Sequence, residues 1–194
     1  MCAQILRKGA HMTEMESKEL LLKALAALDS ELVSIGSELL EIRIVGGFAM
    51  ILHNIRETGF TQDIDSMTRD FEPHIKQLIA KIGKQMGIKL GWLNADMVLD
   101  DPEIISLIIG ETNFDDYGDY QVLSVKVADL PTLLKLKIVA AGDTILVRDD
   151  IEHERHARDL MALLKALDIN SIDTLMEIAP VSEEYPELLR VLFP

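Results

Sequence analysis

The feature that most constrains the fold is a run of β-branched residues that ends at two glycines and continues into an apolar helix. Residues 42–45 (Ile-Arg-Ile-Val) predict a short strand, Gly46 and Gly47 follow, and residues 48–53 predict the start of a buried helix. Glycines at such a junction let the backbone approach a ligand closely. The N–H groups that begin the helix can bind anions, phosphates in particular. A plain tight turn is the simpler explanation of the glycine pair on its own.

A second strand is predicted over residues 63–67, where polar and apolar residues alternate. Side chains at i and i+2 of a strand point to the same face, so Asp63 and Asp65 project together with Cα atoms about 6–7 Å apart. Two neighbouring carboxylates repel each other, and a divalent cation between them relieves that repulsion. The alternative is a pair of solvated acids on an exposed face of the sheet, with Ile64 buried behind them.

The two motifs gain meaning when they are combined. A glycine turn that cradles phosphates, followed by two carboxylates on one face of a strand, predicts a site for a nucleoside triphosphate with Mg²⁺. The turn would hold the β- and γ-phosphates, and the aspartates would hold the ion against the α-phosphate, where an acceptor hydroxyl attacks in line.

The remaining pattern alternates between helical and extended segments. Helical periodicity predicts six further helices, at residues 17–35, 72–86, 129–141, 150–167, 172–178 and 183–192. Further strands are expected at residues 89–98, 104–109 and 122–127, and the polar segment 111–120 resembles a hairpin loop between the last two. This order predicts an α+β fold with α/β-like character: a mixed sheet flanked by helices at residues 13–128, and a helical C-terminal region at 129–194 packed on that core.

Composition narrows the setting and the partners. The 194 residues carry 19 Lys and Arg against 33 Asp and Glu, a formal net charge of −14, which disfavours nucleic acid as a partner. One cysteine, Cys2, excludes an internal disulfide and fits a reducing cytoplasm. No apolar run approaches the roughly 18 residues of a membrane span, so no membrane association is expected.

Several segments together resemble a known family. Residues 46–49 (Gly-Gly-Phe-Ala) followed by 61–65 (Thr-Gln-Asp-Ile-Asp) are similar to the signature of the nucleotidyltransferase superfamily. More narrowly, they resemble a bacterial group related to abortive-infection and type IV toxin–antitoxin nucleotidyltransferases. Residues 91–96 resemble the Trp-Leu-Asn strand of that group, 133–140 its lysine-bearing helix, and 155–160 its closing helix. The likeness covers roughly residues 41–165.

The resemblance implies a nucleotidyltransferase core that transfers a nucleoside monophosphate from ATP or another NTP, with Mg²⁺, to a small-molecule or protein acceptor. It implies that Asp63, Asp65 and a third carboxylate bind the metal. Asp96 is the expected third acid, with Asp100 and Asp101 as competitors. Lys137 would contact a phosphate and offset charge in the transition state, although a solvated lysine on an amphipathic helix is its alternative reading. The second function that the resemblance allows is a non-catalytic nucleotide-binding or partner-binding member of a toxin–antitoxin pair.

The chain departs from the family pattern at two points. Many members carry Gly-Ser at the turn, whereas Gly47 offers only its backbone, and Arg56 lies further upstream of the aspartates than the arginine of the group.

His153 and His156 do not form a zinc-protease motif, because that motif needs histidines at i and i+4. We expect both to lie on a solvated helix surface.

Overall fold

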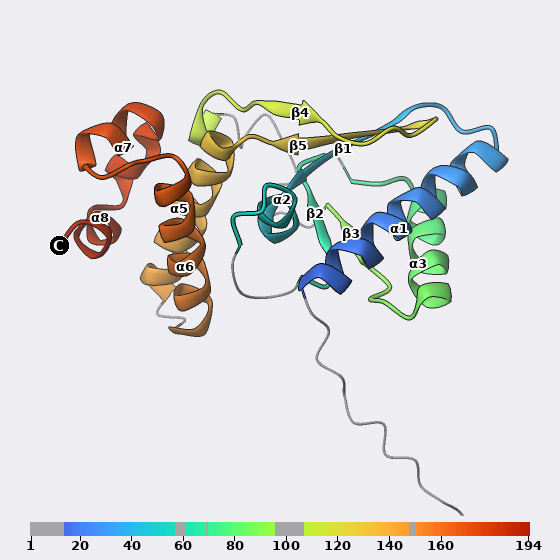
Figure 1. Cartoon of the computed structure of the whole chain (residues 1–194), viewed down its shortest axis with the longest axis horizontal. Coiled ribbons are helices and arrows are strands. Elements are labelled where there is room, and N and C mark those ends of the chain that lie inside the picture. Colours follow the sequence, from blue (N-terminus) through green and yellow to red (C-terminus); the bar gives the residue numbers. More distant parts are fainter. Residues whose placement is uncertain (1–13, 57–60, 69, 96–106, 148–149) are drawn as a thin grey trace, which may run out of the picture.

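The computed structural model of the chain describes residues 14–56, 61–68, 70–95, 107–147 and 150–194. It confirms an α+β fold in which a mixed sheet is followed by a helical C-terminal region (Figure 1). The strands are β1 (Leu40–Val45), β2 (Ile64–Ser66), β3 (Leu93–Asn94), β4 (Phe114–Asp116) and β5 (Leu123–Ala128). The labelled helices are α1 (Glu14–Ser34), α2 (Gly46–Leu52), α3 (Pro73–Met86), α5 (Leu130–Val147), α6 (Asp150–Ala166), α7 (Ile172–Ile178), the 3₁₀ helix η1 (Pro180–Glu184) and α8 (Pro186–Leu192).

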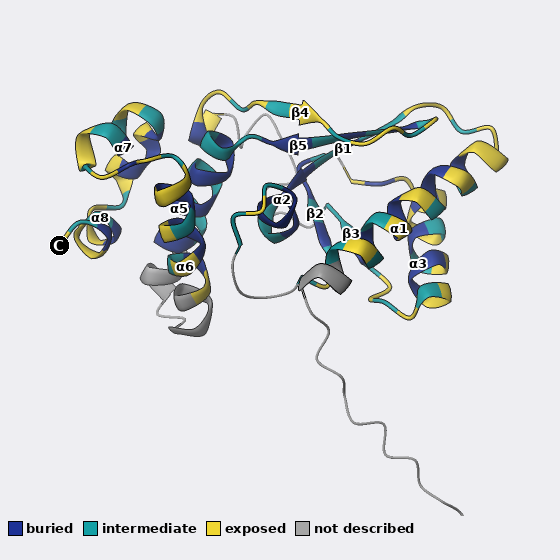
Figure 2. Ribbon diagram, viewed as in Figure 1, coloured by how far each residue is buried: buried dark blue, intermediate teal, exposed yellow. Residues whose placement is uncertain are grey.

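The sheet has the strand order β3-β2-β1-β5-β4. β1 pairs in parallel with β5 and antiparallel with β2, while β2 pairs in parallel with β3. Alternation along the central strands places Ile42 and Ile44 in the core. On the other face Glu41 accepts ion pairs from Arg43 and Lys126, at 2.8 and 3.4 Å. Buried and partly exposed residues therefore alternate along these two strands (Figure 2).

Helices gather at both ends of the sheet. α1 packs against α3 at one end, α5 to α8 gather at the other, and α2 lies between them (Figure 1). Asp29 of α1 accepts hydrogen bonds from the three consecutive N–H groups of residues 121–123, at 2.9–3.0 Å, and so ties α1 to the start of β5. Gly36, at φ +64°, ends α1 as a left-handed cap, as the sequence indicates.

The short strands differ from the sequence prediction. The strand expected at 89–98 is limited to β3 among its described residues, because Lys89 to Trp92 form a turn in which the Trp92 N–H donates to the Lys89 carbonyl at 3.1 Å. The strand expected at 104–109 is wrong for residues 107–109, which are helical, and its earlier residues lie outside the described part. An apolar run of that length carries no periodicity that separates strand from helix.

The segment predicted as a hairpin loop contains a strand of its own. Phe114 to Asp116 form β4, the antiparallel edge partner of β5, with Asp116 opposite Lys126. Helix α5 begins where predicted, capped by Asp129, whose Oδ1 accepts from the Thr132 N–H at 2.8 Å, but it continues beyond residue 141. The helix expected at 183–192 is divided between η1 and α8. In the described part of the chain, no helix is both long and apolar enough to cross a bilayer.

Candidate functional site

The glycine pair opens α2 and lies beside the aspartates. Gly46 has φ +66°, in the left-handed region that strains other residues. A Cβ on Gly46 would lie 2.5 Å from Asp65 Oδ2, and one on Gly47 would collide with the Arg56 guanidinium. Gly46 therefore suits its left-handed backbone, and the absence of a side chain at both glycines lets a carboxylate and a guanidinium approach the start of α2.

The two carboxylates lie on and next to β2: Asp65 is in the strand, and Asp63 is the residue directly before it. Val45, Asp65 and Asn94 are register partners across β1, β2 and β3, so they lie side by side on the face opposite the buried Ile44 and Ile64. The Asn94 amide donates to Asp65 Oδ1 at 3.3 Å. Burial, and then the negative charge of Asp63, raise the pKa of the Asp65 carboxyl above its ordinary value.

Asp63 is held by contacts of its own. The Thr61 hydroxyl lies 3.0 Å from the Asp63 carbonyl and 3.2 Å from its Oδ1, both acceptors. The Lys89 ammonium lies 2.6 Å from Asp63 Oδ2. Both side-chain oxygens of Asp63 therefore have a donor beside them.

Opposite the aspartates lies a buried charge network that joins α5, α6 and the residues after α2. Asp159 of α6 lies 2.7 Å from Lys137 Nζ and 3.4 Å from Arg56 Nε. The exposed fractions of these side chains are 5% for Asp159, 10% for Lys137 and 12% for Arg56. Burial lowers the pKa of the Lys137 ammonium, and the neighbouring Asp159 carboxylate opposes that shift. One carboxylate thus orients two cations toward the same space.

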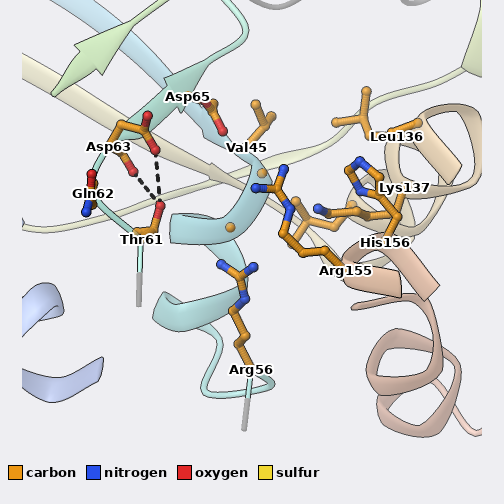
Figure 3. Close-up of a pocket in the computed structure, with 14 residues that line it drawn as sticks. Val45, Arg56, Thr61, Gln62, Asp63, Asp65, Leu136, Lys137, Arg155 and His156 are labelled. Atoms are coloured by element: carbon orange, nitrogen blue, oxygen red, sulfur yellow. Dashed lines mark hydrogen bonds between the residues drawn. The ribbon is translucent and has the colours of Figure 1, made fainter. Parts of the chain in front are cut away.

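These groups line one cavity of about 510 Å³, within the size range of small-molecule and cofactor sites. Asp63 and Asp65 lie on one side, and Lys137, Arg155 and His156 on the other (Figure 3). The complete lining is Val45, Gly46, Gly47, Arg56, Thr61, Gln62, Asp63, Asp65, Leu133, Leu136, Lys137, Ala140, Arg155 and His156. The core and the helical C-terminal region both contribute to it.

The cavity unites five of the six residues that the sequence singles out, namely Gly46, Gly47, Asp63, Asp65 and Lys137. The sixth, Asp96, lies outside the described residues, as do its competitors at 100 and 101. The shared cleft that the sequence predicts for the glycines and the aspartates is present.

One expectation for a single residue is wrong, one alternative reading is excluded, and four contributors had no predicted role. His156 is buried, although it was expected on a solvated helix surface. Lys137 is buried too, which excludes its alternative reading as a solvated lysine. The contributors without a predicted role are Arg56, Asn94, Arg155 and Asp159. No spacing in the sequence links these residues to the aspartates, because they come from segments that only the fold brings together.

The residues suit a hard divalent cation that a phosphate ligand accompanies. Mg²⁺ is typically held by one or two carboxylates and by substrate oxygens, and not by a complete protein cage. Asp63 and Asp65 supply such a pair, and their mutual repulsion is what a cation would relieve. Within the described residues, no group of three or more His, Cys, Asp or Glu side chains is arranged to hold a metal by itself.

No protein-family model, curated protein or solved structure matches the chain. The resemblance to nucleotidyltransferases therefore stays a prediction from sequence motifs, and the chemistry of the site is argued from its own geometry.

Proposed function

We propose that the cavity binds a nucleoside triphosphate with Mg²⁺ and that the protein transfers the nucleoside monophosphate to a small-molecule or protein acceptor. One observation supports this above all: a single cavity combines two carboxylates, two glycines at a helix start, and the cations Arg56, Lys137 and Arg155. A polyphosphate chelating a divalent ion needs this division of charge, with anions toward the metal and cations toward the phosphate oxygens.

Each group has a role that follows from its chemistry. Asp63 and Asp65 would hold Mg²⁺, which when bound neutralises phosphate charge and aligns the polyphosphate. Lys137 and Arg155 would contact phosphate oxygens and stabilise the charge that develops during transfer. Asp159 contacts neither the metal nor the phosphates in this scheme. It is a positioning residue whose ion pairs hold Lys137 and Arg56 at the cavity.

The reaction exchanges a phosphoanhydride bond for a phosphate ester bond. The acceptor oxygen forms a bond to the α-phosphorus, the bond from that phosphorus to the oxygen bridging to the β-phosphate breaks, and pyrophosphate leaves with the electron pair. The acceptor hydroxyl proton passes to solvent. The net charge of −14 disfavours a nucleic acid acceptor, which leaves small molecules and proteins.

The test is turnover with α-labelled nucleotides. The protein is incubated with each of the four labelled triphosphates, Mg²⁺ and a panel of acceptors, and both label transfer and pyrophosphate release are measured. We expect Asp63→Asn and Asp65→Asn each to reduce transfer on the order of 100-fold or more. Asp70→Asn removes an exposed carboxylate of the same kind, paired to Lys76, and should leave transfer unchanged. Full activity in both site variants would refute the proposal.

A second candidate is a nucleotide-binding protein without turnover, such as one member of a toxin–antitoxin pair in the cytoplasm. The observation in its favour is that the register partner of Asp65 on β3 is Asn94, an amide. A third carboxylate at this position would contact the same ion as Asp65, and the amide does not supply that charge. Saturable Mg²⁺-dependent nucleotide binding, with no pyrophosphate released across the acceptor panel, would favour this candidate over the enzyme.

A further inference from the structure

A lysine stands against the outer carboxylate of the pair. The Lys89 ammonium lies 2.6 Å from Asp63 Oδ2, across 26 residues of sequence. About half of the Lys89 side chain is exposed (53%), against 26% for Asp63. The lysine therefore reaches from the solvent side to a carboxylate that lines the cavity.

The backbone that carries Lys89 is fixed by the packing of the turn between α3 and β3. Gly87 ends α3 in the left-handed conformation, and the Ile88 N–H donates to the Gly83 carbonyl at 2.9 Å. Next to the lysine, Trp92 is fully buried and its indole N–H donates to the Ile79 carbonyl at 2.9 Å. Gly83 allows the turn to close, since a Cβ there would lie 2.6 Å from the Lys89 carbonyl oxygen. The side chain of Lys89 thus starts from a backbone position that the packing of this turn fixes.

We propose that Lys89 is a built-in counterion of the carboxylate pair that competes with the divalent cation for Asp63. The inference rests on the proposed function, because it concerns the same cation site. The Thr61 hydroxyl lies beside one Asp63 oxygen and Lys89 beside the other, so an incoming ion meets a positive charge at the carboxylate it needs. The Lys89 ammonium, on a flexible four-carbon side chain, can move away from Asp63 into solvent. The Thr61 hydroxyl stays close to Asp63, because the two residues are only two positions apart in the chain.

The consequence is a site that binds a bare divalent ion weakly. Lys89 neutralises part of the charge of Asp63 and Asp65 before loading, and its displacement opposes ion binding. A metal–nucleotide complex brings phosphates for Arg56, Lys137 and Arg155 as well, so it has additional contacts with which to displace the lysine. Lys89 therefore makes the site selective for the cation in its nucleotide-bound form.

The test is direct cation binding, without turnover. Mn²⁺ is titrated into the nucleotide-free protein, and free Mn²⁺ is followed by electron paramagnetic resonance. Lys89→Met removes the charge and keeps the length of the side chain; a unit charge at the distance of an ion pair, screened by solvent, changes ion affinity by about tenfold. We expect Lys89→Met to bind Mn²⁺ about tenfold more tightly than the natural chain, and Lys89→Arg, which keeps the charge, to bind like it.

Two further variants separate the explanations. Lys84→Met removes an exposed charge from the last turn of α3 and should leave Mn²⁺ affinity unchanged. Asp63→Asn combined with Lys89→Met should lose the gain. Equal affinity in Lys89→Met and the natural chain, or an equal gain in Lys84→Met, would overturn the role of Lys89 while the cation site stands. If none of the variants binds Mn²⁺ saturably, the cation site of the proposed function fails, and the inference about Lys89 fails with it.

Discussion

Removing the charge of Asp159 should destabilise the protein more than any other single-atom change at the site. The Asp159 carboxylate lies between Lys137 and Arg56, and all three side chains are at most 12% exposed. Asp159→Asn keeps the shape of the side chain but leaves two buried cations without a counter-charge. Breaking a buried ion pair from one side costs about 3–5 kcal/mol, since the remaining charge is desolvated without compensation.

The measurement is the free energy of unfolding from urea titration, supported by the melting temperature. At about 2–4 °C per kcal/mol for a chain of this length, Asp159→Asn should lower the melting temperature by about 6–20 °C. The matched control is Asp70→Asn, which breaks the exposed ion pair with Lys76 and should change stability by about 0–1 kcal/mol.

A double mutant shows whether the loss arises from the stranded cations. Lys137→Met in the Asp159→Asn background removes one of them and should recover at least about 1 kcal/mol. A loss below about 1 kcal/mol in Asp159→Asn, or no recovery in the double mutant, would refute the view that Asp159 holds the two cations in place.

Two other predictions concern the acidic side of the cavity. Gly46→Ala should lower the free energy of unfolding by about 1–3 kcal/mol and abolish nucleotide binding, because the residue has φ +66° and its Cβ would meet Asp65. The control is Gly87→Ala, at φ +69° in open space, which should cost only about 1 kcal/mol. Equal losses for the two variants in urea unfolding would contradict the close approach of Asp65 to Gly46. Asp65→Asn should raise the melting temperature of the metal-free protein by about 2–4 °C at pH 7, since the fold raises the pKa of this carboxyl and thus disfavours its charged form. The stability linked to Asp65 is complete below its unfolded pKa and is lost as the pH rises through the folded value, so the advantage of the variant should vanish in acid; an advantage independent of pH would count against this.

The sequence predicts the acidic and glycine side of the site because that side is local. Gly46 and Gly47 directly follow β1, and Asp63 and Asp65 share one strand face, so spacing alone places each pair. The predicted α+β class is also correct, since the sequence predicts α1, α3 and the C-terminal helices close to where they are found.

The cationic side could not be predicted in the same way, because it depends on how helices pack. Lys137 meets Asp159 only when α5 and α6 lie against each other, and Arg56 reaches the same carboxylate from a segment about 100 residues earlier. The usable sign was the placement of Lys137 among the buried residues Leu133, Leu134 and Ile138, where a solvated lysine is not expected.

The edge strands differ from the prediction for a related reason: β4 was predicted as part of a loop, and β3 was expected to extend over 89–98. β3 is held by its pairing with β2 and by the buried Trp92, and β4 by its pairing with β5, so neither has a pattern of its own. Asn94 becomes a neighbour of Asp65 only through that register.

The central claim is that the carboxylates and the cations act together on one metal–nucleotide complex. It is tested most directly by calorimetric titration of the protein with a non-hydrolysable triphosphate, with Mg²⁺ and with EDTA. The account predicts saturable binding that requires Mg²⁺, is lost in Asp65→Asn, and is weakened by Lys137→Met. Binding of equal strength in EDTA and in Asp65→Asn would contradict it, as would the absence of binding for all four nucleotides.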